Sequence, residues 1–319
     1  MREAQHENEE RLIKRLMTLS QEGSACCGEF LATLDSLHRT DLYTGLIIER
    51  LHRKMRIVEQ LHKEADENWN QTFYLLYFRT LGDNLNRENY LELARRVPYR
   101  ILLRERLADR AIEAMLIGAS GLIDLYPDDE YTIGLRREFE HLRAKYQIEK
   151  MEASSWVLRE VRPANHPILR LAQAAEFFRQ DELLFDRVLS CHAKQEIERL
   201  FCIEAGSYWF RHDIPGSEGR ERPKRIGAFK ANIIGINLVV VLQFAYGLIC
   251  GIEPMKERAL ELLEQLPAED NRYMRLWQST GVKARDAFES QALLQLHTEH
   301  CLQKACRECP LARRMVARL

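Results

Sequence analysis

Helix-breaking residues are scarce in this chain, and their scarcity is the strongest constraint on its fold. It has 15 glycines and 9 prolines in 319 residues, whereas average usage would place about 12% of a chain in these two types. In the segments between these glycines and prolines, apolar residues recur at helical spacing. The clearest series steps by four, four, three and three and consists of Ile47, Leu51, Met55, Val58 and Leu61. The sequence therefore predicts an all-α fold, a multi-helix globular array.

Helical patterns extend over most of the chain. Thr40-Asp41 supplies an N-cap for the long helix that carries this series. Further helices are predicted over residues 2–21, 29–38, 69–81, 87–96, 168–180, 182–190, 193–205, 255–265, 268–279 and 282–303. Gly118-Ala119-Ser120-Gly121 is predicted to break the chain between two packed segments. The longest loop is expected at 211–227, and at most one short strand pair is expected, for which only the apolar stretch 236–242 is suited.

The length allows one large domain or two of ordinary size. We predict an N-terminal helical lobe over residues 1–150 and a C-terminal helical lobe over 151–319, with their boundary near 147–156. The second lobe carries a basic loop, 211–230, and a cysteine-rich end. A single domain is the alternative.

The overall charge gives no field that would recruit nucleic acid or a membrane, because 47 Lys and Arg face 48 Asp and Glu. The one membrane candidate, residues 233–252, is interrupted by Asn237, Gln243 and three glycines, so a buried helix or strand–helix pair fits better. The charged N-terminus lacks the apolar stretch of a secretory signal. We expect a cytoplasmic protein with reduced thiols and no membrane partner.

The cysteine-rich end has the spacing of a metal site. Cys301, Cys306 and Cys309 form a C-x4-C-x2-C pattern, and His297 shares a helical face with Cys301. The pattern suits zinc bound by three Cys and one His. It equally suits an iron–sulfur cluster completed by Cys191, Cys202 or Cys250. The alternative is buried thiols that only pack, which is also our interpretation of Cys26-Cys27.

Two basic segments are candidates for phosphate contacts. Arg100 and Arg104 lie one helical turn apart within an arginine-rich stretch over residues 95–110. Arg222 lies in the basic loop 211–230. In both cases the alternative is an ordinary solvated surface, with its own ion pairs in the first.

The segment around two prolines at 163 and 167 is a candidate binding surface. It presents Arg162, Asn165 and His166, and Arg170 and Gln173 follow in the first turns of the next helix. An anion there would meet guanidinium groups and free backbone N–H groups. The alternative is a structural corner whose polar side chains satisfy buried carbonyls.

Several segments together form a recognisable set of motifs. The most specific is the Arg-Pro-x-Asn-x-Pro-x-x-Arg pattern of Arg162–Arg170. The others are Glu49-Arg50-Leu51 with Lys54, Asn68–Tyr74, Glu113–Gly121, Tyr208-Trp209 with His212, Leu266–Asn271 and the cysteine-rich end. With these segments the chain resembles the bacterial domain-of-unknown-function family 2851. The resemblance runs from about residue 40 to the C-terminus. It implies an architecture, and it implies no activity because the family has no assigned function.

The chain departs from the family pattern in three ways. His166 stands where the family often has Phe, and Ala119 stands where it often has Gln. Family members usually carry a preceding half, with Gly-Pro-Asp-Phe and Glu-x-His segments that resemble a metal-dependent nuclease core, and neither segment occurs in this sequence. The resemblance therefore implies the helical C-terminal portion of such a protein and a nuclease-like partner.

Three functions stay open. The favoured one is a non-catalytic helical module that binds nucleic acid or a nuclease-like partner and has a structural metal site at its C-terminus. The second is an enzyme with a site around Arg162–Arg170 and with Glu113 or His212 as the acid–base group. The third is a structural or assembly protein. The sequence contains no phosphate-binding glycine loop, no G-x-S-x-G and no H-E-x-x-H pattern, so we expect no catalysis by this chain alone.

Overall fold

The computed structural model describes residues 2–20, 25–159 and 161–318. Within this part of the chain the fold is all-α with one short strand pair, which confirms the predicted class. The chain forms two compact units. Unit 1 comprises Met1–Arg56 and Tyr246–Leu319, and unit 2 comprises Ile57–Ala245.

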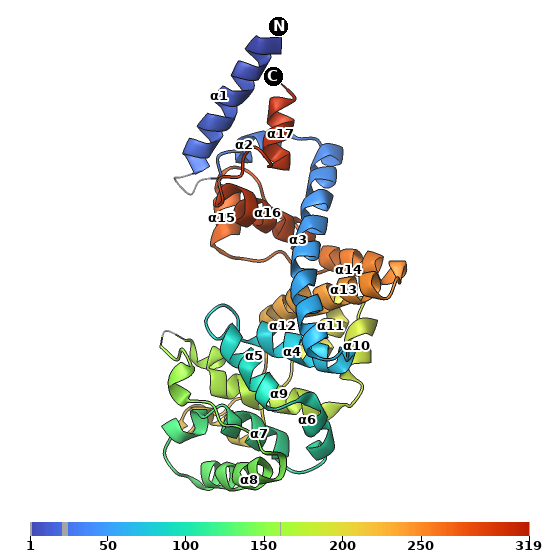
Figure 1. Cartoon of the computed structure of the whole chain (residues 1–319). Coiled ribbons are helices and arrows are strands. Elements are labelled where there is room, and N and C mark those ends of the chain that lie inside the picture. Colours follow the sequence, from blue (N-terminus) through green and yellow to red (C-terminus); the bar gives the residue numbers. More distant parts are fainter. Residues whose placement is uncertain (1, 21–24, 160, 319) are drawn as a thin grey trace. The chain divides into compact units, whose positions relative to one another are not determined.

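Unit 2 is built on α7, whose nine residues are all buried and which packs against both α8 and α9 (Figure 1). The complete helices of unit 2 before the apolar run at 235–245 are α4 (Trp69–Leu81), α5 (Arg87–Arg96), α6 (Tyr99–Glu105), α7 (Ala111–Ala119), α8 (Glu130–Tyr146), α9 (Pro167–Gln180), α10 (Leu184–Ser190), α11 (Lys194–Phe201) and α12 (Ala228–Ile234). The unit also includes the end of α3 (Ser36–Glu64) and the start of α13 (Val240–Ile249). Short 3-10 turns lie at η1 (Leu122–Leu125), η2 (Ala153–Ser155), η3 (Pro163–Asn165) and η4 (Ser207–Phe210). The predicted helices 69–81 and 87–96 are confirmed to the residue.

An aromatic core joins α4 to α9. The rings of Tyr77 and Phe177 are stacked with centroids 4.8 Å apart, and Phe78 stacks on Phe178 at 5.8 Å. All four side chains are buried. Aromatic pairs of this kind contribute about 0.5–1.5 kcal/mol beyond the area they bury, so they fix the position of α9 on α4.

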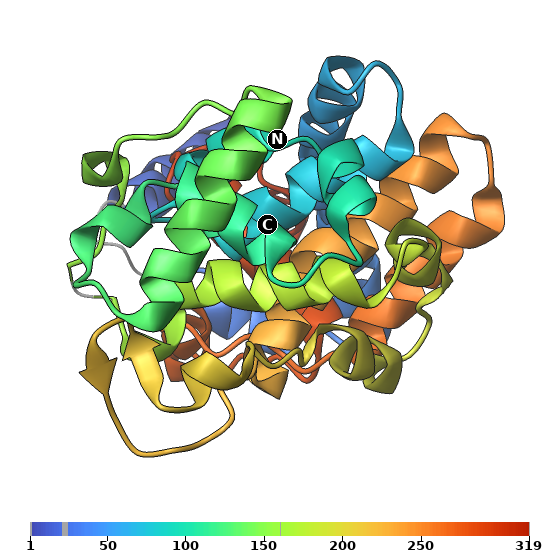
Figure 2. The same ribbon diagram turned by 90° about the horizontal axis from the view of Figure 1, so that it is seen from below.

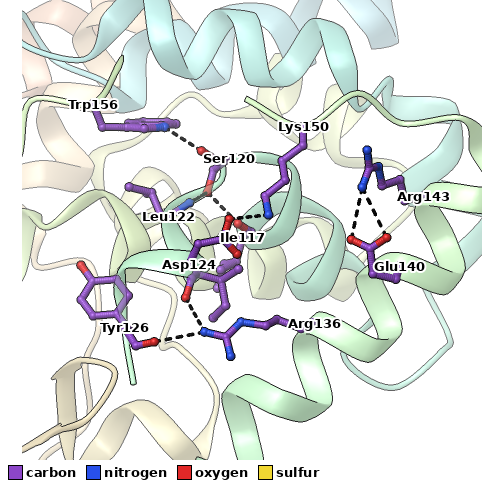
Figure 3. Close-up of polar contacts among 11 residues, drawn as sticks. Ile117, Ser120, Leu122, Asp124, Tyr126, Arg136, Glu140, Arg143, Lys150 and Trp156 are labelled. Atoms are coloured by element: carbon purple, nitrogen blue, oxygen red, sulfur yellow. Dashed lines mark hydrogen bonds and ion pairs between the residues drawn. The ribbon is translucent and has the colours of Figure 1, made fainter. Parts of the chain in front are cut away.

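The end of α7 is held by a hydrogen-bonded turn (Figure 3). Ser120 Oγ donates to the Ile117 carbonyl at 2.7 Å and accepts from the Leu122 amide at 3.2 Å. Gly121 has φ +74°, a conformation that glycine adopts without strain. The predicted break at residues 118–121 is therefore confirmed, and the chain turns there toward α8.

The segment expected to separate two lobes, residues 147–156, lies inside unit 2. The Met151 amide donates to the Ala119 carbonyl at 2.7 Å, and Trp156 Nε1 donates to the Ser120 carbonyl at 2.9 Å. These bonds tie the segment to the end of α7. The segment is thus a packed part of the unit.

The strand pair lies where a loop was expected. β1 (His212–Ile214) pairs with the antiparallel β2 (Ser217–Glu218) across the Pro215-Gly216 turn (Figure 2). The strand interpretation of 236–242 was wrong, because η5 (Gly235–Val239) is π-helical and α13 (Val240–Ile249) continues it. A short, fully buried apolar run has no periodicity that separates strand from helix.

The same apolar run belongs to one continuous helix, Ala228–Ile249, whose most apolar 18-residue window has a mean hydropathy of 1.9. It is long and apolar enough to cross a membrane, but 72% of its most apolar window is buried inside the protein. Such burial is typical of a core helix, as the sequence analysis expected.

Unit 1 contains both ends of the chain. Its helices are α1 (Arg2–Ser20), α2 (Gly28–Thr33), the first part of α3 (Ser36–Glu64), the end of α13, α14 (Glu253–Gln265), α15 (Arg272–Ser279), α16 (Ala287–Gln295) and α17 (Pro310–Val316). The π-helical η6 (Leu296–Cys301) continues α16. The helix predicted over 282–303 therefore begins later, at Ala287, where the Asp286 side chain accepts from the Glu289 amide at 2.9 Å. The predicted last residue of the first helix, residue 21, lies outside the described residues.

A buried glutamine links α3 to α16. Gln295 accepts from Arg53 at 3.0 Å and donates to Glu49 at 2.9 Å, and Arg53 forms an ion pair with Glu299 at 3.3 Å. Because Gln295 is fully buried, these bonds satisfy groups that would otherwise cost about 1–3 kcal/mol each.

Close packing of α7 on α8 makes a testable prediction. A methyl group at Gly118 would lie 2.1 Å from a ring carbon of Phe139, so Gly118→Ala should destabilise the protein by about 1–3 kcal/mol. Gly134→Ala is the matched control, because a methyl group there meets nothing within 4 Å. Its higher helix propensity should stabilise α8 by up to about 1 kcal/mol. Urea unfolding measures both changes, and equal midpoints for the two variants would contradict this packing.

Candidate functional site

A cavity of about 270 Å³ lies in unit 2. One wall is the segment Ala108–Glu113, which leads into α7. The others come from Tyr131 on α8, from α9 and from the η4 turn. Charged groups and aromatic rings thus line one cavity that is open to solvent on one side.

Glu113 is the central group of the cavity. It is the one charged residue of α7, and only 7% of its surface is exposed. Its Oε1 accepts from Tyr131 Oη at 2.6 Å and from Trp209 Nε1 at 2.7 Å. Burial raises the pKa of Glu113, and these two hydrogen bonds oppose the shift because they stabilise the charged form.

Stacked aromatic rings form the wall beside Glu113. The rings of Tyr131 and Tyr208 lie 3.6 Å apart and nearly parallel. Tyr208 Oη donates to Asp129 at 2.7 Å, and Asp129 is also the N-cap of α8. His212 stacks on Tyr208 at 4.0 Å. His212 is half-buried and therefore lies at the edge of the core.

Two arginines line the cavity. The Arg110 guanidinium lies 5.3 Å from the centre of the Tyr131 ring, a cation–π geometry. Arg179 pairs with Glu176 at 2.6 Å, and both line the cavity. The cavity therefore offers positive groups, aromatic surface and a hydrogen-bond acceptor to a ligand.

Internal hydrogen bonds connect part of the predicted surface at Arg162–Gln173. Arg170, which is 5% exposed, donates to Asn165 Oδ1 at 2.6 Å and to Gln173 Oε1 at 2.8 Å. Gln173 in turn donates to the Lys224 carbonyl at 3.0 Å. His166 caps α9, and its Nε2 lies 3.3 Å from Tyr126 Oη. The lining of the Glu113 cavity includes none of the five predicted residues.

The arginine-rich stretch divides into paired and unpaired residues. Arg95 pairs with Glu64 at 2.7 Å, Arg96 with Glu92 at 2.8 Å and Arg106 with Glu182 at 3.4 Å. Arg100 and Arg104 of α6 are both exposed, and no carboxylate among the described residues lies within ion-pair distance of either.

The basic loop is largely neutralised by its own neighbours. Arg211 pairs with Glu221 at 2.7 Å, whereas Arg222 and Lys224 both approach Asp213, at 3.9 and 2.6 Å. Arg222 also lines a second cavity, of about 260 Å³. The loop therefore presents less free charge than its composition suggests.

The predicted metal ligands lie in unit 1. Cys306 and Cys309 are buried, and Cys301 is half-buried. The His297 ring is buried 4.9 Å from the ring of Tyr273 and 6.3 Å from that of Trp277. In the described parts of the chain no three His, Cys, Asp or Glu side chains already form a metal site.

The model of one protein family, described as a protein of unknown function (DUF2851), matches residues 3–272. The chain belongs to this family. The DUF2851 match begins well before residue 40, where the resemblance was expected to start, and it includes the Glu113 cavity. The cysteine-rich end lies beyond it. No curated protein and no solved structure matches the chain.

Three residues that line the Glu113 cavity of this DUF2851 protein were not predicted as site residues: Arg110, Tyr131 and Arg179. A signal was present at Glu113, because a single carboxylate in a nine-residue apolar helix must find donors elsewhere in the fold. Which donors it finds depends on the packing of α8 and η4 against α7.

The raised pKa of Glu113 predicts a pH-dependent stability. At pH values just above 4.5, the ordinary pKa of a glutamate, Glu113 keeps its proton in the folded state, whereas it has lost the proton in the unfolded state. The stabilisation is therefore complete below pH 4.5 and is lost as the pH rises through the raised pKa. Arg110 and Glu176 also act on Glu113, in opposite directions.

The stability difference between wild type and Glu113→Gln should accordingly fall as the pH increases, because the glutamine amide of the variant does not titrate. Thermal unfolding over a pH series measures this difference. In Tyr131→Phe the loss of a hydrogen bond should raise the pKa of Glu113 further and move the decline to higher pH. A difference that does not change with pH would contradict the assignment.

Proposed function

We propose that this DUF2851 protein is a cytoplasmic, non-catalytic helical module that binds single-stranded nucleic acid through unit 2. The observation that carries the proposal is the pair of arginines on α6, Arg100 and Arg104. They lie one helical turn apart, and no carboxylate among the described residues is within ion-pair distance of either.

Unpaired arginines favour phosphate binding because no internal ion pair has to break first. Each contact would release counterions condensed on the nucleic acid. This release is the main source of affinity for a sugar–phosphate backbone. The net charge of the chain is only −1, so repulsion from the rest of the protein is small. Phosphate contacts of this kind position a strand and carry no sequence information.

The Glu113 cavity supports recognition of an unstacked base. The segment that follows α6 contains Arg110, which lines the cavity. The arginines proposed to contact the nucleic-acid strand and the cavity therefore belong to neighbouring stretches of the protein chain. Proteins recognise single strands by stacking bases on aromatic or guanidinium groups and by hydrogen bonds to their edges. The cavity lining supplies a guanidinium group in Arg110 and a carboxylate in Glu113, beside the stacked rings of Tyr131 and Tyr208.

Charge reversal tests the phosphate contacts. In Arg100→Glu/Arg104→Glu, binding of a fluorescent oligonucleotide should weaken, and the slope of log K against log salt should become shallower by about 1.4, since each single-strand phosphate contact contributes about 0.7. Fluorescence anisotropy over a salt series gives both quantities. Arg143→Glu/Arg275→Glu is the control, because it changes the net charge equally at exposed arginines that pair with Glu140 and Asp270. Absence of binding by the wild type at low salt would contradict the proposal.

Base recognition has a separate readout. Glu113→Gln should change the relative affinities for the four homopolymeric oligonucleotides and leave the salt slope unchanged, because Glu113 contacts no phosphate in this arrangement. Competition anisotropy measures the relative affinities. Unaltered base preference in a folded variant would exclude the cavity from the binding site.

A further inference from the structure

Unit 1 contains a buried arginine that has no counter-ion. Arg50 on α3 is only 8% exposed, and it makes no hydrogen bond and no ion pair with another described residue. A guanidinium keeps its charge in proteins and carries five N–H donors. Burying such a group without an acceptor is strongly unfavourable. The described fold therefore leaves a strong donor group without a partner.

The nearby charges do not offset the burial of Arg50. Burial lowers the pKa of Arg50 to about 10, and the positive charge of Arg53 lowers it as well. Glu269 and Glu299 oppose the shift, but the pKa stays below its ordinary value of 12.5. Glu269 accepts a hydrogen bond from Gln291 at 2.8 Å, and Glu299 pairs with Arg53. Both carboxylates are thus engaged with other donors.

The neighbours of Arg50 on α3 form a polar network with α16 and η6, which lie beside α3 (Figure 1). Glu49 Oε1 accepts from Gln295 at 2.9 Å, and its Oε2 lies 3.4 Å from His300 Nε2. Arg53 donates to Gln295 at 3.0 Å. Arg50 and Arg53 are three residues apart and lie on the same face of the helix. Arg50 is therefore next to this network.

Two nitrogens of the network also lack partners. Arg53 Nε and His300 Nδ1 are buried, and neither has a hydrogen-bond partner among the described residues. His300 lies on η6, and π-helical turns frequently occur at functional sites. The side chains of Glu49, Arg53 and Glu299 are 45%, 41% and 32% exposed, whereas that of His300 is 10% exposed. The network is thus open to solvent on one side and has unpartnered nitrogens on its buried side.

We propose that Arg50, Arg53 and His300 bind a phosphate group between α3 and η6 of unit 1. A guanidinium presents its N–H groups in a fork that matches phosphate oxygens. Arg53 Nε supplies a further donor, and His300 donates through Nδ1 when its ring is protonated. A phosphate has enough acceptor oxygens for donors from two elements. This site does not depend on nucleic-acid binding by unit 2.

The test uses inorganic phosphate and the full chain. Isothermal titration calorimetry should detect phosphate binding to the wild type, and chloride at the same ionic strength should give no such signal. In Arg50→Met the phosphate affinity should fall by at least about 10-fold, because a hydrogen bond to a charged group typically contributes that much. Arg275→Met is the matched control. It removes an exposed arginine of the same unit, which pairs with Asp270 at 3.0 Å, and should leave the affinity unchanged.

Stability without phosphate separates a binding role from a structural one. Because Arg50→Met removes a buried charge that has no partner, its urea midpoint in the absence of phosphate should equal or exceed that of the wild type. Added phosphate should raise the midpoint of the wild type and leave that of the variant unchanged. If Arg50→Met does not fold, Arg50→Lys replaces it. This variant keeps the charge but loses the fork, so phosphate should bind more weakly.

A short single-stranded oligonucleotide, added in competition, identifies the source of the phosphate group. Displacement of inorganic phosphate assigns the site to a nucleic-acid backbone, whereas unchanged phosphate binding assigns it to free phosphate or a small phosphorylated molecule. Three results would overturn the proposal. They are a folded wild type that binds no phosphate, an Arg50→Met variant that binds it as the wild type does, and an Arg50→Met variant that is less stable than the wild type without phosphate.

Discussion

The burial of one carboxylate on an apolar helix is the constraint on which unit 2 depends. α7 supplies nine buried residues, and its only charged group, Glu113, accepts hydrogen bonds from Tyr131 and Trp209. An unpaired buried carboxylate would cost several kcal/mol, so α8 and the η4 turn must be placed where their donors reach it. The cavity lies beside this group and is lined by Tyr131 and Trp209, the two donors to Glu113.

Charge pairing decides which basic residues are available to a partner. Judged by composition, every arginine of residues 95–110 is an equal candidate for a phosphate contact. In the structure, three of them form ion pairs with carboxylates of other segments or of their own helix. Surface pairs of this kind contribute little stability, about 0–1 kcal/mol, yet they reduce the field that a phosphate would meet. The unpaired residues Arg100 and Arg104 are therefore a more specific candidate than the arginine-rich stretch as a whole.

Features that depend on interactions between residues close together in the sequence can be predicted from it, whereas features that depend on distant residues cannot. Helices 69–81 and 87–96 depend on local periodicity and caps, such as the Asn68 side chain that accepts from the Gln71 amide, and these are readable in the sequence. The strand pair at residues 212–218 depends on a two-residue turn within a polar loop, where hydrophobic alternation gives no signal. The partners of Glu113 are 18 and 96 residues away, and no spacing rule connects such positions.

The Arg162–Gln173 segment shows how the polar side chains of a specific motif can be paired within the protein. Its side chains combine the donors and acceptors of an anion site, but Arg170 is satisfied by Asn165 and Gln173, and Gln173 by the Lys224 carbonyl. A buried guanidinium that keeps its charge requires acceptors at fixed positions, and two prolines hold the corner that provides them. These hydrogen bonds join α9 to the chain before α12, and none of the five predicted residues lines the Glu113 cavity.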